Sequence, residues 1–156
     1  MQAQSFLRTV TAGVLVIGLG VTLAFASADD KIKARQAEMK NNGKAIGALV
    51  AIMKGEQPYD AAVVKASIDS MAAGDAASAK VGAWDADSAK GETVETYAKP
   101  EIWAEGSDVG TKYKAWVDAR NAVAATTDEA SFKAAFPALG ESCKGCHEKF
   151  RRPKEN

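Results

Sequence analysis

The chain has 156 residues, and its 20 basic residues balance its 20 acidic ones, so the formal net charge is zero at pH 7. This balance gives no global attraction for nucleic acid or for an anionic membrane surface, and we expect neither as a partner. Residues 29–156, which remain after a predicted leader is removed, fit one domain with a single core.

Residues 1–28 have the pattern of a secretory signal peptide. Arg8 supplies the positive charge, and an apolar run over residues 12–25 follows it. Cleavage is expected after Ala28 or, as the close alternative, after Ala26, which places the mature chain in the periplasm. The other interpretation is an uncleaved membrane anchor, although the apolar run is shorter than the roughly 20 residues needed to cross a bilayer.

The first half of the mature chain contains two segments with apolar residues at helical spacing. The first helix is expected over residues 30–54, with Gly55 ending it, and the second over residues 61–79, with Asp60 as its N-cap. In residues 80–99, Gly, Asp, Ser and Thr interrupt every period. We therefore expect a long connection there, with at most one turn of helix.

The second half contains two more helical segments. The third helix is expected over residues 100–125, with Pro100 at its first position. The fourth runs to about Arg152, opened by a capping box of Thr126 and Glu129, with a kink or break at Pro137. The residues expected on the apolar faces of the first three helices are Ile32, Met39, Ile46, Val50, Met53, Val64, Ile68, Met71, Ile102, Trp103, Tyr113, Trp116, Val117 and Val123. On the fourth helix, Phe132, Phe136, Leu139 and Phe150 form an apolar stripe that suits one side of a flat cofactor. No segment has strand periodicity, so the sequence predicts an all-α fold, an antiparallel four-helix bundle that can hold a cofactor between facing helices.

The fourth helix ends in Cys143-Lys144-Gly145-Cys146-His147, a C-x-x-C-H motif that contains the only histidine of the chain. This motif is typical of c-type haem attachment, in which the two thiols add to the haem vinyl groups and the imidazole binds the iron. At about 100° per residue, Cys146 and His147 lie about 60° and 40° to either side of Cys143, so the three side chains share one helix face. We predict one covalent haem c near the C-terminal helix, with His147 as an axial ligand.

Three other interpretations of the motif are weaker. A zinc site would need a fourth ligand, which usually comes from a second Cys or His pair that the chain lacks. A thioredoxin-like dithiol would follow a strand in a βαβ unit. A simple disulfide between the two cysteines leaves the adjacent histidine unexplained.

Several segments together resemble the class II c-type cytochromes, the cytochrome c-prime family. They are the C-terminal run from Cys143 to Arg151, the pairs Arg35-Gln36, Met39-Lys40 and Asn42-Gly43, the turn from Lys54 to Asp60, and the run from Lys99 to Trp103. The match covers the whole mature chain in the same order. The resemblance implies a periplasmic four-helix bundle with one covalent haem, which is often a homodimer through the first two helices.

The resemblance also implies further contacts with the haem. It places Arg35 and Gln36 at the haem propionates, Thr96 at a loop contact and Met39 over the distal face. Arg35 suits a propionate because its planar guanidinium can bind a carboxylate through two parallel hydrogen bonds.

The second axial ligand divides two functional hypotheses. If the sulfur of Met39 binds the iron, the centre is six-coordinate and low-spin, and His/Met ligation suits one-electron transfer between redox partner proteins. If Met39 only packs on the distal side, the iron stays five-coordinate and high-spin and binds NO or CO as a gas trap or sensor. We favour electron transfer. No paired carboxylates or phosphate-binding loop indicate catalysis, so we do not expect an enzyme.

Overall fold

The computed structural model describes residues 26–153, so most of the predicted signal peptide, residues 1–28, lies outside the described residues. The helices are α1 (Ala28–Met53), α2 (Ala61–Lys80), α3 (Val109–Ala124) and α4 (Glu129–Phe150), with two short 3-10 turns, η1 (Ala86–Ser88) and η2 (Pro100–Trp103). The only β-pairing within residues 26–153 is an isolated antiparallel bridge between Ala98 and Arg151. These elements confirm the predicted all-α four-helix bundle.

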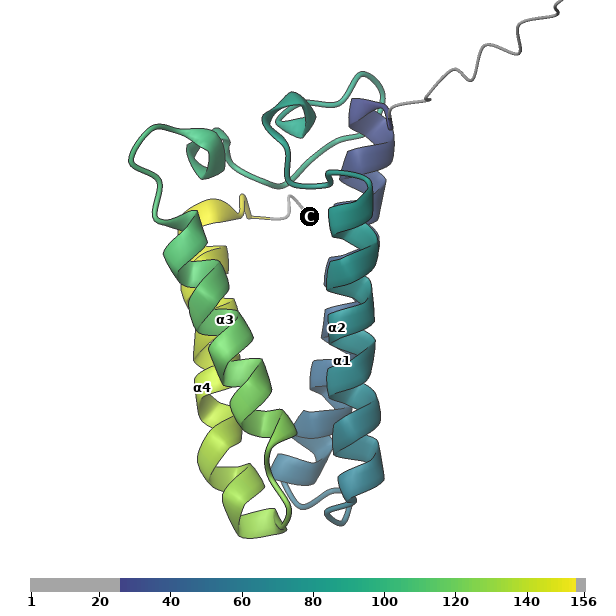
Figure 1. Cartoon of the computed structure of the whole chain (residues 1–156), viewed down its shortest axis with the longest axis vertical. Coiled ribbons are helices and arrows are strands. Elements are labelled where there is room, and N and C mark those ends of the chain that lie inside the picture. The colour runs from purple at the N-terminus through teal and green to yellow at the C-terminus, as the bar shows by residue number, and fades with distance from the viewer. Residues whose placement is uncertain (1–25, 154–156) are drawn as a thin grey trace, which may run out of the picture.

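The helices form two antiparallel hairpins that stand side by side. Helices α1 and α2 form one hairpin and helices α3 and α4 the other, and the connection over residues 81–108 crosses one end of the bundle (Figure 1). We call this end the connection end. The opposite end carries the two short turns within the hairpins, residues 54–60 and 125–128, and we call it the turn end.

The helix starts follow local capping chemistry. Ser27 and Asp30 form a capping box at the start of α1, and the Asp60 carboxylate accepts hydrogen bonds from the first amides of α2, as predicted. The prediction for α4 was wrong in detail, because its cap is Asp128, which pairs reciprocally with Ser131. Asp128 and Ser131, three residues apart, therefore form the capping box that was expected from Thr126 and Glu129.

The third predicted helix is interrupted. Pro100 starts only the short turn η2, and α3 begins nine residues later at Val109. Gly106 lies between them with a φ of +73°, a left-handed conformation that ends helical geometry and that glycine adopts readily. By contrast, α4 continues through Pro137 without the predicted break.

The hydrophobic core lies toward the turn end. Its buried residues come from all four helices: Ala45, Leu49, Ile52, Val64, Ile68, Met71, Ala119, Val123, Phe132, Phe136 and Leu139. The predicted inward face of α2 is confirmed. On α4, Phe132, Phe136 and Leu139 of the stripe expected beside the cofactor lie in this core. Met39 and Tyr113, expected on apolar helix faces, are 37% and 49% exposed. Both lie toward the connection end, where Ile32, Ala83, Ile102 and Phe150 are the buried apolar residues. No helix within residues 26–153 has the length and apolar character that a membrane crossing requires.

Candidate cofactor site

The last turns of α4 present the two thiols and the imidazole on one stretch of helix. Cys143 and Cys146 are half-buried and not joined by a disulfide, and His147 is exposed. Within residues 26–153, no three side chains of the His, Cys, Asp and Glu types are grouped to hold a metal ion. The arrangement therefore offers two separate thiols and an accessible imidazole, all toward the connection end.

The protonation of these groups follows from their surroundings. Burial raises the pKa of both Cys143 and Cys146, so the thiols are protonated at neutral pH. Partial burial of the ring lowers the pKa of His147, and the positive charge of Arg151 lowers it further. The imidazole is therefore neutral at pH 7 and keeps a lone pair for a metal.

Met39 differs from the other two methionines of the described chain. Met71 is fully buried in the core, and Met53 packs against the core from the last turn of α1. Met39 belongs to neither group and is 37% exposed. On the same helix, a Cβ atom built at Gly43 or Gly47 would meet no other atom within 4 Å. Helix α1 therefore carries a thioether outside the core at Met39 and, one and two turns further on, two positions without side chains.

Arg35 lies at the centre of a polar network that joins α1 to the connection. Its guanidinium is buried and donates hydrogen bonds to the carbonyl oxygens of Ala83 (2.5 Å) and Ser88 (3.0 Å), to Ser88 Oγ (2.5 Å) and to Thr96 Oγ1 (3.0 Å). It also lies 5.3 Å from the Trp84 ring and 5.4 Å from the Trp103 ring. The structure thus brings two of the predicted haem contacts, Arg35 and Thr96, together.

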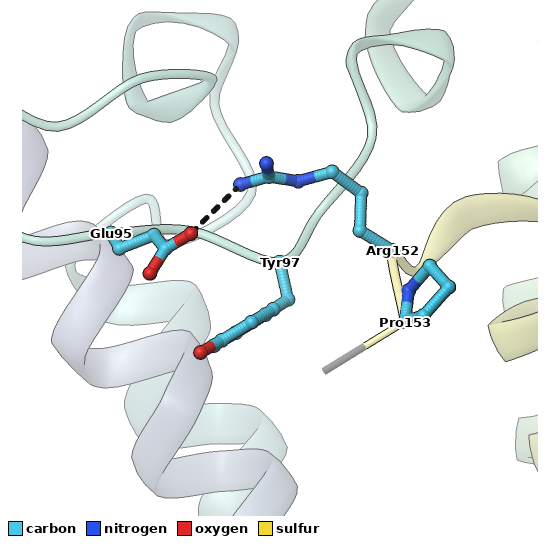
Figure 2. Close-up of a pocket in the computed structure, with 4 residues that line it drawn as sticks. All are labelled: Glu95, Tyr97, Arg152 and Pro153. Carbon is cyan, nitrogen blue, oxygen red and sulfur yellow. Dashed lines mark ion pairs between the residues drawn. The ribbon is translucent and has the colours of Figure 1, made fainter. Parts of the chain in front are cut away.

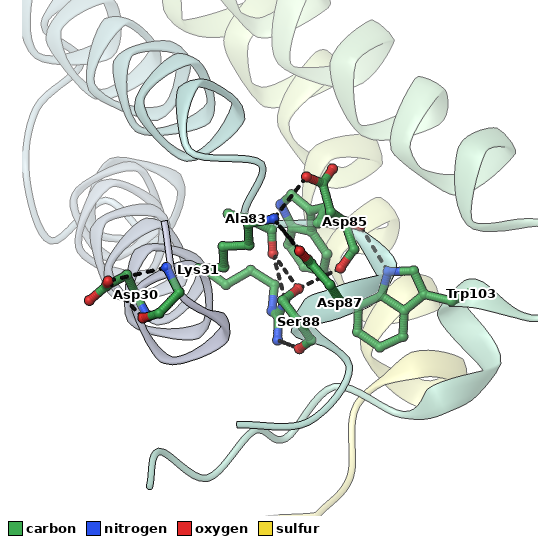
Figure 3. Close-up of polar contacts among 10 residues, drawn as sticks. Asp30, Lys31, Ala83, Asp85, Asp87, Ser88 and Trp103 are labelled. Carbon is green, nitrogen blue, oxygen red and sulfur yellow. Dashed lines mark hydrogen bonds and ion pairs between the residues drawn. The ribbon is translucent and has the colours of Figure 1, made fainter. Parts of the chain in front are cut away.

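Lys31 and Asp29 extend this network toward the start of α1. The ammonium group of Lys31 is 2.8 Å from Asp87 and 3.1 Å from Asp85, beside the Ser88 contacts (Figure 3). The Asp29 carboxylate accepts hydrogen bonds from the backbone amides of residues 92–94. The connection is therefore fastened along the first three turns of α1.

The third predicted contact, Gln36, reaches the connection next to Thr96. Its side-chain amide donates a hydrogen bond to the carbonyl oxygen of Glu95 at 2.8 Å. Glu95 also lines a small surface pocket with Tyr97, Arg152 and Pro153, in which Arg152 lies 3.6 Å from the Glu95 carboxylate (Figure 2). Arg152 is thus held against the connection. The haem roles of Arg35, Gln36 and Thr96 stay predictions.

Sequence reasoning missed the buried carboxylate of Glu38. It accepts hydrogen bonds from Ser78 Oγ (2.5 Å) and Trp84 Nε1 (3.3 Å), and burial raises its pKa. The signal was present in the sequence, because Lys31, Arg35 and Glu38 are spaced by four and three residues on one face of a predicted helix. Charged residues at that spacing on an inward face indicate buried polar contacts.

The donor set fits a covalent haem c. Two unpaired thiols separated by two residues match the two vinyl groups, and a neutral imidazole directly after them matches an iron ligand. Met39 lies on the other hairpin, outside the core and toward the same end of the bundle. The thiols and the imidazole therefore suit attachment of one haem, and the role of Met39 stays a prediction.

Comparisons with known proteins identify the family. Residues 30–151 match the family model described as Cytochrome C'. The chain is 33% identical over 150 residues to cytochrome c-556 of Agrobacterium fabrum. The aligned region covers 95% of this chain and 97% of that protein. It is also similar to a cytochrome c' of known structure, described as having an unusual ligand-controlled dimer dissociation. The TM-score is 0.70 and the identity 34%, and the match covers 83% of this chain and 100% of that chain. A nitric oxide complex of a mutant cytochrome c prime from Alcaligenes xylosoxidans has a TM-score of 0.71 and 28% identity at the same coverage. The chain therefore belongs to the cytochrome c' family, the class II c-type cytochromes, whose cofactor is covalently bound haem c.

Proposed function

We propose that the protein carries single electrons between redox partners in the periplasm and is a carrier, not an enzyme. In this proposal Cys143 and Cys146 attach the haem, and His147 and Met39 are the two axial ligands. The observation that supports it best is the position of Met39, the one methionine of residues 26–153 that is neither in the core nor against it. A thioether left out of the core is available to the cofactor.

Each residue contributes a separate property to this function. Haem c, when bound, supplies one-electron chemistry. His147 is kept unprotonated by its desolvation and by Arg151, so it can bind without first losing a proton. Met39 would supply the second ligand of a His/Met pair, and such a pair raises the reduction potential.

The test is the optical spectrum of the periplasmically expressed protein and of Met39→Ala, each oxidised and reduced. We expect a low-spin spectrum with a ferric iron–sulfur charge-transfer band in the wild type and complete loss of that band in Met39→Ala. Met53→Ala is the matched control, since Met53 packs against the core and should leave the band intact. A high-spin wild-type spectrum that Met39→Ala leaves unchanged would reject Met39 as a ligand.

The second candidate function is binding of NO or CO to a five-coordinate iron. It is favoured by the similarity to the cytochrome c prime crystallised with nitric oxide. In that case Met39 packs beside the distal face, and the reduced wild type binds CO as readily as Met39→Ala does. The same two samples therefore separate the two functions.

We also propose that the protein is exported and forms a homodimer through α1 and α2. The similarity to a cytochrome c' with ligand-controlled dimer dissociation supports the second point, as does the 40% exposure of Val63 on α2. Sedimentation of the wild type and Val63→Asp, with and without CO, tests the dimer. A wild type that sediments as a monomer at every concentration would reject it.

A further inference from the structure

The two hairpins are joined directly by one polar contact centred on Asp75. Tyr113 Oη of α3 donates to the Asp75 carboxylate of α2, at 2.9 and 2.8 Å from its two oxygens, and Arg120 lies 3.5 Å from the same carboxylate. Among residues 26–153, every hydrogen bond and ion pair between a helix of one hairpin and a helix of the other ends on Asp75. We call the three residues Asp75, Tyr113 and Arg120 the seam.

On the first hairpin, the seam lies at the same height along the bundle as Met39. A Cβ atom added at Gly74 would stand 3.1 Å from Asn41 Nδ2 and 3.7 Å from Glu38 Cγ. Glu38 and Asn41 flank Met39 in the sequence, so α2 at Gly74 and Asp75 abuts α1 at Met39. The absence of a side chain at Gly74 allows this close approach.

On the second hairpin, the seam lies at the height of the haem attachment motif. A Cβ atom added at Gly145 would stand 3.6 Å from Lys112 Nζ, and Lys112 directly precedes Tyr113. Gly145 lies between Cys143 and Cys146. The seam on α2 and α3 is therefore across the bundle from the two helices that carry Met39 and His147.

The contacts of the seam persist over the neutral pH range. Arg120 is buried, and its guanidinium lies 4.5 Å from the Trp116 ring, which holds the charge beside Asp75. Burial and the contact with Asp75 raise the pKa of Tyr113 to about 12, so its hydroxyl remains a donor over the whole neutral range. The core approaches the seam from the turn end, where Met71 lies one helical turn before Asp75 and Ala119 directly precedes Arg120. The connection links the hairpins only indirectly.

We propose that the seam positions Met39 against the haem iron by fixing the separation of the two hairpins at the height of the axial ligands. A ligand pair drawn from two hairpins needs its geometry held within about 0.5 Å, so a small spreading of the hairpins is enough to weaken it. The inference rests on the proposed ligation by Met39. It assigns Asp75, Tyr113 and Arg120 as positioning residues, since none of them is proposed to touch the iron.

The experiment compares haem-loaded Asp75→Ala and Tyr113→Phe with the wild type. We expect the iron–sulfur charge-transfer band to weaken in both, more in Asp75→Ala, which removes every contact of the seam. We also expect the CO affinity of the reduced Asp75→Ala protein to rise about tenfold, because a hydrogen bond to a charged group corresponds to a factor of that order. Far-ultraviolet circular dichroism confirms that each variant is folded.

Two controls make the result specific. Asp69→Ala changes the same residue type on the same helix, but Asp69 pairs only with Lys65 of α2, so the band should not change. In a Met39→Ala background, Asp75→Ala should leave CO affinity as it is, since the ligand that the seam positions has been removed.

The outcomes distinguish this inference from the proposed function. If the wild type has no iron–sulfur band, the proposed function fails and the inference fails with it. If the wild type has the band and Asp75→Ala lowers only the melting temperature, the inference alone is rejected and the seam is purely structural. An equal rise in CO affinity with and without Met39 also rejects it.

Discussion

Asp29 organises the connection through a single carboxylate. It accepts hydrogen bonds from Thr93 Oγ1 at 2.5 Å and from the backbone amides of Glu92, Thr93 and Val94. The Thr93 hydroxyl has the largest effect and lowers the pKa of Asp29 below its ordinary value of 3.8. Desolvation, next in size, opposes this change, and the three backbone amides lower the pKa further. The folded protein therefore prefers the ionised form more strongly than the unfolded chain does. This contribution to stability is present above pH 3.8 and is lost as the pH falls through the lowered pKa.

We predict that Asp29→Asn lowers the free energy of unfolding near pH 7 and that its difference from wild type shrinks in acid. Chemical denaturation of both proteins between pH 3 and pH 7 measures this difference. Thr93→Val, which removes the donor with the largest effect on the carboxyl, should change the pH profile in the same direction. A difference that is constant over the whole range would show that Asp29 acts by packing and not through its charge.

The contacts of Arg35 with the connection could be predicted only in part from the sequence. The resemblance grouped Arg35, Gln36 and Thr96 at the haem, and the structure brings them together at one edge of the connection. The partners of Arg35 on the connection lie 48 to 61 residues away in the chain. Helical spacing carries no information over such separations, so these contacts could not be predicted from the sequence alone.

The N-cap of helix α1 depends on where the predicted signal peptide is cleaved. Ser27 and Asp30 form its capping box, with Ser27 Oγ accepting from the Asp30 amide at 3.2 Å. Cleavage after Ala26 keeps this cap, whereas cleavage after Ala28 removes it. Cleavage after Ala28 also places the positive terminal amine at the N-terminal end of the helix dipole, which is unfavourable.

We predict that a mature form beginning at Ser27 is more stable than one beginning at Asp29 by about 1 kcal/mol, the usual contribution of an N-cap. Denaturant unfolding of the two purified forms gives this difference. In the longer form, Ser27→Ala should remove most of it. Equal stability of the two forms would mean that the cap contributes nothing to the folded bundle.

Predictions of whole elements succeeded where a local signal was strong. The spacing of apolar residues located α1, α2 and α4 to within about two residues, because long amphipathic helices repeat their signal several times. The third helix failed because Pro100 starts both a 3-10 turn and an α-helix equally well. The turn ends at Ala104, whose backbone is extended, and Gly106 then adopts a left-handed conformation before α3 begins. The sequence neighbours of these residues do not specify either conformation.

Over the whole molecule, hydrophobic packing and cofactor binding are divided between the two ends. The core residues lie toward the turn end, whereas Cys143, Cys146, His147 and Met39 lie toward the connection end. The connection end has fewer buried apolar residues, among them Ile32 and Phe150, and is held largely by polar contacts such as those of Arg35 and Asp75. Regions held by few apolar contacts open more readily than a packed core.

We therefore predict that the haem-free chain, obtained as Cys143→Ala/Cys146→Ala, keeps its turn end and loosens at its connection end. Amide hydrogen exchange should be slow around Leu49, Ile68 and Phe136 and fast around Met39 and Tyr113. The haem-loaded wild type, measured alongside, should be protected at both ends. Uniform protection in the haem-free variant would show that the polar network alone holds the connection end.

The three tryptophans all lie beside arginine side chains. Trp84 and Trp103 flank Arg35, and Trp116 lies against Arg120 of the seam. The indole emission of the haem-free chain therefore reports on the joints between the hairpins and the connection, while circular dichroism reports on the helices as a whole. If the fluorescence changes at a lower denaturant concentration than the circular dichroism, the joints open before the helices melt. Fluorescence then gives a direct optical measure of the step that exposes the haem-binding face.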